Sequence, residues 1–333
     1  MAIVENVGTF AVRQVLSYVD RDPEKNLPKL LDWFDRFDRK ETLKVQRDII
    51  RTVVMDPDNN WHQLVMSLWK DIDPGVRNRI FENFIINGCL LGYQRQKENK
   101  EKYNCNIPWA ILLDPTSACN LKCTGCWAAE YGNHMNLTYE EMDDIVRQGV
   151  ELGTYVYLFT GGEPLVRKKD IIRLCEDHPD CVFSTFTNGT LIDEAFADEM
   201  LRVKNFVPAI SIEGFEEATD SRRGDGTYQK IIRAMNILKE KKLPFGISCC
   251  YTSANAEVIG SEAYFDRMIE MGAKFAWFFT YMPVGKGAVT ELMATAEQRE
   301  MMYHKIREYR KTKPIFTVDF WNDGEYVGGC IAG

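Results

Sequence analysis

Three cysteines, Cys119, Cys123 and Cys126, are the residues whose type and spacing best support chemistry. Thiolates are soft ligands that suit iron–sulfur clusters and zinc. Three thiolates on one loop can hold three corners of an iron–sulfur cube and leave the fourth iron without a protein ligand. Because catalytic metal sites keep one coordination position open, this spacing predicts a catalytic iron–sulfur centre.

Two other interpretations of these cysteines stay open at this point. A structural zinc site would need a fourth ligand, for which Cys105 and His134 are the nearest candidates. The Cys123-x-x-Cys126 pair could also be a thioredoxin-like redox motif. However, Cys119 precedes that pair, and the surrounding sequence is not a thioredoxin-sized unit. The iron–sulfur interpretation is therefore preferred.

The overall composition indicates a globular chain without an export signal. Its 333 residues include ten cysteines and four histidines, which is too dilute for a disulfide-stapled scaffold. Lysine and arginine total 41 and aspartate and glutamate total 49, so the net charge is −8 and nucleic acid is not an expected partner. No apolar run approaches the roughly 18 residues of a membrane span, and the N-terminus lacks a signal-peptide pattern. We expect a cytoplasmic protein with no transmembrane segment.

The first hundred residues are predicted to form an all-α domain without a recognisable chemical motif. Apolar residues recur there at three- and four-residue spacing, which predicts helices over 27–37, 41–54, 61–71 and 75–93. The next stretch, 94–106, is polar and dense in charge and is predicted to be a linker. A helical domain is therefore expected over residues 1–100.

From residue 107 onward the pattern changes to alternating strands and helices. Short apolar runs predict strands at 109–113, 155–159, 181–186, 206–212, 245–251 and 275–281, with a further strand-like run at 314–319. Amphipathic segments predict helices at 138–152, 167–177, 192–203, 227–241, 258–271 and 295–310. Strands that are apolar on both faces favour a parallel sheet covered by helices. Periodicity alone does not distinguish an open doubly wound sheet from a partial barrel.

Motifs in the first two strand–helix loops resemble those of the radical S-adenosylmethionine (SAM) enzymes. Cys-x3-Cys-x2-Cys follows the first predicted strand, and Gly-Gly-Glu-Pro at 161–164 follows the second. The resemblance covers about residues 108–285 and implies an α/β fold, a partial (β/α)6 TIM-type barrel, over residues 101–310. It also implies a 4Fe–4S cluster on the three cysteines and S-adenosyl-L-methionine as a cofactor. The motifs all fall just after predicted strands, which is the active face of such a barrel.

The resemblance also assigns residues to SAM binding. The residues expected to contact SAM are Gly161, Gly162, Glu163, Pro164, Asn188, Ser211, Glu213, Arg223 and Trp127. Two adjacent glycines let a backbone approach a ligand closely, and Glu163 offers an acceptor to the methionine ammonium group. Arg223 matches the arginine that pairs with the SAM carboxylate better than its neighbour Arg222 does, and a guanidinium fork suits a carboxylate. No residue is assigned to the chemistry on the final substrate.

The sequence departs from the family pattern in two places. The aromatic residue usually found before the third cysteine is replaced by Gly125, and the aromatic Trp127 follows that cysteine instead. Cys330, preceded by two glycines, resembles the start of a C-terminal auxiliary-cluster (SPASM-like) extension over 311–333, which is expected to be incomplete. By contrast, Cys249 and Cys250 lie in a predicted strand and are expected to be core residues.

The resemblance implies a radical SAM enzyme. A reduced 4Fe–4S cluster would cleave SAM to methionine and a 5′-deoxyadenosyl radical, which would abstract hydrogen from a substrate, expected to be a peptide or protein. The implied partners are this unidentified substrate and a low-potential electron donor of flavodoxin or ferredoxin type. The alternative is a non-catalytic protein on the same barrel, either an iron–sulfur electron carrier or a zinc-stabilised binding protein.

Overall fold

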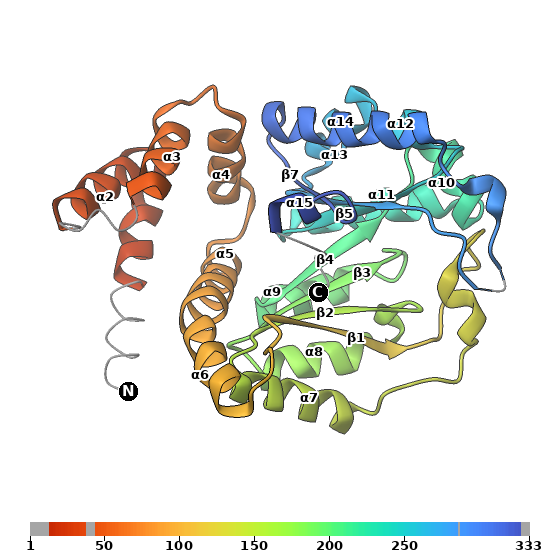
Figure 1. The fold of residues 1–333 in the computed structure, drawn as a ribbon, viewed down its shortest axis with the longest axis horizontal. Helices are drawn as coiled ribbons and strands as arrows, with labels where there is room; N and C mark the ends of the chain where they lie inside the picture. Colours follow the sequence, from red (N-terminus) through yellow and green to blue (C-terminus); the bar gives the residue numbers. More distant parts are fainter. Residues whose placement is uncertain (1–12, 38–43, 286, 328–333) are drawn as a thin grey trace.

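The structure, a computed structural model, describes residues 13–37, 44–285 and 287–327, and one parallel sheet lies at its centre (Figure 1). Within these ranges the sheet has seven strands in the order β1-β2-β3-β4-β5-β6-β7. Strand order therefore follows chain order, unlike the reversal of order in a doubly wound sheet. β1 and β7 form the two edges, so the barrel is open between them. This arrangement confirms the predicted α/β fold class.

Each of the six predicted strands overlaps an observed one. The strands are β1 (Ala110–Thr116), β2 (Val156–Gly161), β3 (Val182–Thr187), β4 (Phe206–Ser211), β5 (Gly246–Tyr251), β6 (Phe275–Thr280) and β7 (Phe316–Asp319). β7 corresponds to the strand-like run at 314–319 and pairs in parallel with β6. Part of the predicted C-terminal extension therefore belongs to the sheet. Cys330, on which the extension was based, lies outside the described residues.

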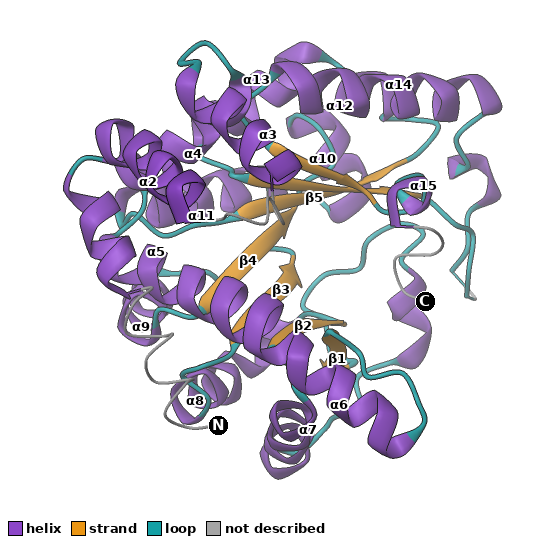
Figure 2. Ribbon diagram, turned by 60° about the vertical axis from the view of Figure 1, so that its left-hand side comes forward, coloured by secondary structure: helices purple, strands orange, loops and turns teal. Residues whose placement is uncertain are grey.

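Helices pack on the outer face of the sheet, as Figure 2 shows. They are α7 (Tyr139–Leu152), α8 (Lys168–Asp177), α9 (Glu194–Val203), α10 (Glu216–Arg223), α11 (Thr227–Glu240), α12 (Ala256–Ile259), α13 (Glu262–Met271), α14 (Ala296–Thr312) and α15 (Gly324–Val327). Alternate strand residues point outward into the core, so Tyr157 and Phe159 of β2 are fully buried. Met142 and Val146 are likewise fully buried on α7, one helical turn apart. The sequence analysis did not predict α10, which begins just after β4.

A second group of helices precedes the sheet in the chain. Residues 13–21 are helical, followed by α2 (Pro23–Phe37), α3 (Lys44–Met55), α4 (Asn60–Asp71), α5 (Pro74–Phe81), a π-helix (Glu82–Gly92) and α6 (Tyr93–Tyr103). In Figure 1 the orange helices α5 and α6 stand at the end of the sheet opposite the yellow loop that follows β1. The N-terminal helices therefore lie at the amino ends of the strands.

Amide side chains join these N-terminal helices to the turns that lead into the strands. Asn83, fully buried, donates from Nδ2 to the carbonyl oxygens of Pro179 and Cys181, both at 2.8 Å. Gln96 donates to the carbonyl oxygen of Gly153 at 2.8 Å. Asn60 donates in the same way to the carbonyl oxygens of Arg310, in the last turn of α14, and of Lys313, just after it. These bonds satisfy backbone acceptors that the packed helices would otherwise leave buried and unpaired.

The prediction of a linker over residues 94–106 is wrong, because α6 occupies most of that stretch. Its polar residues bind the turn before β2: Arg95 donates to the Tyr155 hydroxyl at 2.8 Å, and Asn99 donates to two backbone carbonyls. A charge-dense sequence thus forms a helix here because its polar side chains have partners on the barrel. In the described ranges, no helix is both long and apolar enough to cross a membrane.

Candidate radical SAM site at the carboxyl edge of the sheet

The three cysteines lie on the loop between β1 and a short 3-10 helix (Trp127–Tyr131), and each is half-buried. The loop folds back on itself: Leu121 N–H donates to Cys119 Sγ at 3.4 Å, and Cys126 N–H donates to the Cys123 carbonyl at 3.2 Å. Burial raises the pKa of the Cys119 and Cys123 thiols, and for Cys123 the guanidinium of Arg223 opposes that rise. The thiols are therefore half-accessible and partly desolvated, and Cys123 also lies near the positive charge of Arg223.

The loop after β2, with Gly161, Gly162 and Glu163, is clamped onto the cysteine loop. Gly162 N–H donates to the Thr116 carbonyl at 2.9 Å, and Glu163 N–H donates to the Ala118 carbonyl at 2.8 Å. A Cβ atom on Gly162 would lie 2.3 Å from that Ala118 oxygen, so another residue would force the two loops apart. The glycines are thus required for contact between the loops, a reason that the sequence analysis did not foresee.

Glu163 is buried beneath these loops, with 1% of its surface exposed. Its carboxylate accepts hydrogen bonds from Thr187 Oγ1 at 2.6 Å, from Asn188 N–H at 2.7 Å and from Leu165 N–H at 3.0 Å. A carboxylate has about four acceptor positions, so one remains for a ligand. Burial raises the pKa of this carboxyl. Its evident role is to hold the loops after β2 and β3 together, and the predicted contact with the SAM ammonium stays a prediction.

Three further predicted residues, Asn188, Pro164 and Ser211, lie at or just after the carboxyl ends of β2 to β4. Asn188 Nδ2 donates to Asn120 Oδ1 at 2.8 Å, which ties the turn after β3 to the cysteine loop. Pro164 is buried and begins a 3-10 helix (Pro164–Arg167). Ser211 ends β4, and its hydroxyl lies 2.9 Å from the Ser248 hydroxyl of β5. Four of the loops or strand ends that the sequence analysis singled out therefore meet at one edge of the sheet.

Glu213 and Arg223, both predicted to contact SAM, are paired with each other. Glu213 is fully buried, and its Oε1 accepts from Arg223 Nη2, from Arg223 Nε at 3.0 Å and from Arg222 Nη1 at 2.5 Å. Its Oε2 accepts from Cys250 N–H at 3.1 Å. Burial alone would raise the pKa of this carboxyl, but the two guanidinium groups hold it below its ordinary value. Sequence reasoning missed this pairing, because α10 was not predicted.

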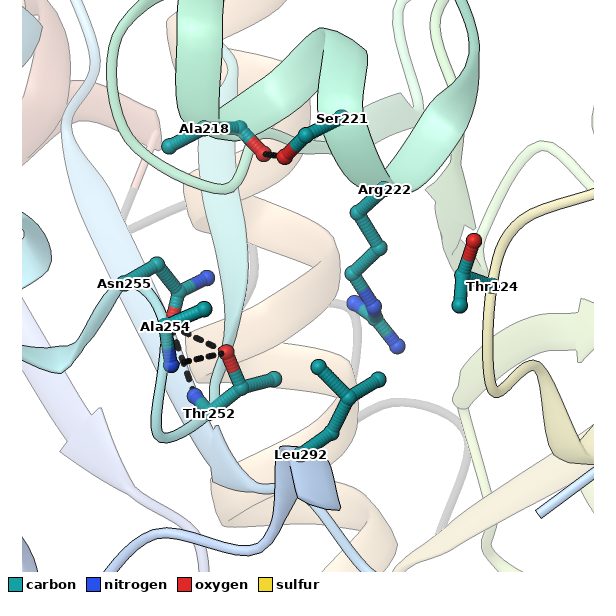
Figure 3. Close-up of a pocket in the computed structure, with 8 residues that line it drawn as sticks. All are labelled: Thr124, Ala218, Ser221, Arg222, Thr252, Ala254, Asn255 and Leu292. Atoms are coloured by element: carbon teal, nitrogen blue, oxygen red, sulfur yellow. Dashed lines mark hydrogen bonds between the residues drawn. The ribbon is translucent and has the colours of Figure 1, made fainter. Parts of the chain in front are cut away.

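Arg222 points into a cavity of about 70 Å³ beside the cysteine loop (Figure 3). Thr124 lines it from the cysteine loop, Thr252 and Asn255 from the loop after β5, and Leu292 from the segment after β6. The Thr252 N–H and hydroxyl both donate to Asn255 Oδ1, at 2.6 and 3.0 Å, which fixes that wall. The cavity thus has a cationic side and a neutral polar side.

Tyr281 explains the departure from the family pattern at Gly125. A Cβ on Gly125 would lie 2.6 Å from the Tyr281 hydroxyl, and the backbone there has a φ of +69°, which L side chains rarely adopt. Tyr281 is buried, and its hydroxyl accepts from Val289 N–H at 3.0 Å. The Tyr281 ring, which follows β6, therefore occupies the space that an aromatic side chain at position 125 would need. Trp127 is 45% exposed and meets the Tyr131 ring edge-on.

Aromatic side chains line the inside of the barrel below this edge. The ring centroids of Phe186 on β3 and Trp277 on β6 are 5.6 Å apart, although β4 and β5 lie between these two strands in the sheet. Rings on non-adjacent strands can meet only across the interior. Phe279 and Phe320 extend the same cluster, with centroids 5.1 Å apart. All four rings are partly exposed, so they form an accessible apolar wall.

The donor set fits an iron–sulfur cluster. In the residues that the structure describes, no three His, Cys, Asp or Glu side chains are grouped closely enough to hold a single metal ion. In a 4Fe–4S cube each thiolate binds a different iron, so the thiols need not converge on one point. The three half-buried thiols on one loop satisfy that requirement.

Comparison with known protein families finds a match over part of the chain. Residues 113–254 match the family model described as the radical SAM superfamily. This match confirms the predicted resemblance, and the radical SAM family uses a 4Fe–4S cluster together with SAM.

Similar proteins act on different substrates. Fe-coproporphyrin III synthase of Methanosarcina barkeri is 29% identical over 65% of this chain and 57% of its own length. The cysteine-type anaerobic sulfatase-maturating enzyme of Clostridium perfringens is 32% identical over 45% of this chain and 46% of its own length. Streptococcus suis SuiB bound to S-adenosylmethionine shares the fold, with a TM-score of 0.57 at 19% identity over 71% of this chain and 57% of that one. The chain thus spans about half to three-fifths of the length of these relatives.

Proposed function

We propose that this protein is a radical SAM enzyme whose Cys119, Cys123 and Cys126 hold a 4Fe–4S cluster. The observation that carries the proposal is the position of three half-buried thiols on a loop that the glycine loop clamps at the carboxyl edge of the sheet. When bound, such a cluster supplies the electron that cleaves SAM to methionine and a 5′-deoxyadenosyl radical, which takes hydrogen from a substrate.

The residues around the thiols would bind and orient SAM. We propose contacts from the backbone at Gly161 and Gly162, from the Asn188 and Ser211 side chains and from the exposed ring of Trp127. Support comes from their common position at the edge where the loops after β1 to β4 meet. Glu163 would then act mainly by holding these loops in place.

Partner and compartment follow from the same proposal. One-electron reduction at the negative end of the range for such clusters requires a low-potential donor, so we propose one of flavodoxin or ferredoxin type. Thiols that are half-exposed and unpaired suit a reducing compartment, and we propose the cytoplasm. The N-terminal helices, ending at Tyr103, would form the base of the barrel.

The substrate we propose first is a peptide or protein. A PqqA peptide cyclase of Granulibacter bethesdensis, 27% identical over 68% of this chain, and the sulfatase-maturating enzyme support this choice. A tetrapyrrole is the second candidate, because Phe186, Trp277, Phe279 and Phe320 provide an aromatic wall inside the barrel, and planar apolar groups stack on such rings. Binding of iron coproporphyrin, followed by its absorption band, should weaken in a Trp277→Ala variant if the tetrapyrrole is the substrate.

Production of 5′-deoxyadenosine tests the proposed activity. The protein is reconstituted anaerobically with iron and sulfide, reduced with dithionite and incubated with SAM. The wild type and a Cys105→Ala control, whose altered thiol is exposed and lies before β1, should both release 5′-deoxyadenosine. A Cys123→Ala variant should release none. Absence of the product from the wild type, or its persistence in Cys123→Ala, would contradict the proposal.

A further inference from the structure

Three charged side chains meet in a largely buried group where the end of α10 contacts the loop after β4. Both Arg222 and Arg223 form a salt bridge with the same carboxylate oxygen of Glu213, Oε1. The exposed fraction of the side chain is 0% for Glu213, 13% for Arg222 and 12% for Arg223. In the described part of the chain neither arginine has a second carboxylate within ion-pair distance. One negative and two positive charges therefore leave one positive charge that is buried and uncompensated.

This charge lies directly against the cysteine loop. The Arg222 carbonyl accepts a hydrogen bond from the N–H of Thr124, the residue after Cys123, at 2.8 Å. The Arg222 guanidinium lines the same cavity as Thr124 and lies 6.0 Å from the centre of the Tyr281 ring, which packs on Gly125 (Figure 3). Its Nε is buried and has no hydrogen-bond partner. The Arg222 guanidinium is thus held beside the cysteine loop, and its Nε–H group has no acceptor among the described residues.

Burying a charge without a counter-charge raises the free energy of the folded protein, and a nearby negative charge reduces that penalty for a buried cation. Reduction of an iron–sulfur cluster by one electron adds negative charge to it. A positive charge close to the cluster therefore stabilises the reduced form and makes reduction easier, whereas a negative charge has the opposite effect.

We propose that Glu213, Arg222 and Arg223 form a charge cluster that sets the reduction potential of the iron–sulfur centre on the cysteine loop. The two arginines raise the potential, and Glu213 both fixes them and limits their effect to one net charge. The inference rests on the proposed function, because it requires the cysteines to hold the centre. It concerns the ease of reduction and is separate from any contact that these residues make with SAM.

Redox titration of the reconstituted protein without SAM tests the charge cluster. The reduced centre is followed by its electron paramagnetic resonance signal as dithionite is added. Arg222→Gln removes a positive charge and should shift the midpoint potential to more negative values. Glu213→Gln removes the negative charge and should shift it to more positive values. Shifts of the same sign in both variants, or no shift in Arg222→Gln, would overturn the proposal.

Matched variants separate charge from structural damage. Arg222→Lys keeps the charge and should restore a potential close to that of the wild type, which also keeps the test decisive if Glu213→Gln does not fold. Arg202→Gln makes the same chemical change on α9, where the arginine is paired with Glu176 and Glu199, and should leave the potential unchanged. A shift in Arg202→Gln as large as that in Arg222→Gln would count against the proposal.

Failure of the inference and failure of the proposed function give different results. If the wild type takes up no iron and sulfide, the proposed function fails. If it takes up both and releases 5′-deoxyadenosine, yet Arg222→Gln has the wild-type potential, the charge cluster alone is refuted.

Discussion

The two edges of the sheet use similar close contacts for different purposes. At the amino edge, Gly92 lies so close to the turn before β2 that a Cβ would sit 2.5 Å from the Gly153 carbonyl oxygen. At the carboxyl edge, a Cβ on Gly162 would sit 2.3 Å from the Ala118 carbonyl oxygen. Near Gly92, the amide side chains of Asn83 and Gln96 donate to backbone carbonyl oxygens. Around Gly162, the backbone contacts support thiols, arginines and a cavity. The comparison indicates that one edge supplies stability and the other supplies chemistry.

The largest expected effect is on the rate of 5′-deoxyadenosine release, and it should distinguish the Gly162→Ala variant from the Gly92→Ala variant. Gly162→Ala should push the loop after β2 away from the cysteine loop. A displacement of about 1 Å at an active site can cost about 100-fold in rate, so we expect a loss of that order in 5′-deoxyadenosine release. Gly92→Ala should instead lower stability by about 1–3 kcal/mol through overpacking and leave the rate nearly unchanged.

Thermal unfolding and 5′-deoxyadenosine release, measured on both glycine variants, check this contrast. Equal losses of rate in Gly92→Ala and Gly162→Ala would remove the functional distinction between the two edges. A rate loss in Gly92→Ala alone would mean that the amino edge, and not the carboxyl edge, controls the reaction.

Asn83 provides the next largest effect, on stability. Asn83→Ala removes the side-chain donor from the Pro179 carbonyl oxygen, whereas the Cys181 carbonyl oxygen keeps a hydrogen bond from Asn205 Nδ2 at 3.1 Å. Because an unpaired buried acceptor costs roughly 1–3 kcal/mol, we expect a loss of stability of that size and a melting temperature several degrees lower. Iron content after reconstitution should match that of the wild type. Loss of the cluster in a folded Asn83→Ala protein would show that the amino edge also shapes the site.

The Asn87→Ala variant should show the smallest change in stability, and it serves as a control for Asn83→Ala. Asn87 lies one helical turn further along. Its Nδ2 donates to the Asp180 carbonyl at 3.0 Å in an exposed hydrogen bond, and to Asn83 Oδ1 at 3.4 Å. Water can replace that donor, so Asn87→Ala should change stability by about 0.5 kcal/mol or less in denaturant unfolding. A loss as large as that in Asn83→Ala would mean that burial does not decide which amide contacts matter.

Much of the carboxyl edge could be predicted from the sequence, because its chemistry is local. Cys119, Cys123 and Cys126 are close in sequence, and the glycine pair at 161–162 directly follows an apolar strand. Apolar runs also located the strands to within a few residues, because most strand residues are buried or half-buried.

Features that depend on distant partners could not be predicted. The replacement of an aromatic residue by Gly125 is explained by Tyr281, which lies more than 150 residues later in the sequence. The pairing of Glu213 with the two arginines was missed, because they lie on a helix whose sequence is too polar to detect, and the predicted contact of Glu213 with SAM stays a prediction. The linker prediction failed for the same reason, because the partners of α6 lie on the barrel. Sequence patterns report burial and local spacing, and they do not report which polar groups meet.

Metal analysis of the reconstituted protein tests the central claim most directly. Iron, zinc and acid-labile sulfide are measured in the wild type and in a variant with Cys119, Cys123 and Cys126 all changed to alanine. The account predicts about four irons and four sulfides per wild-type chain and none in the variant. One zinc without sulfide in the wild type, or the same iron content in the variant, would contradict it.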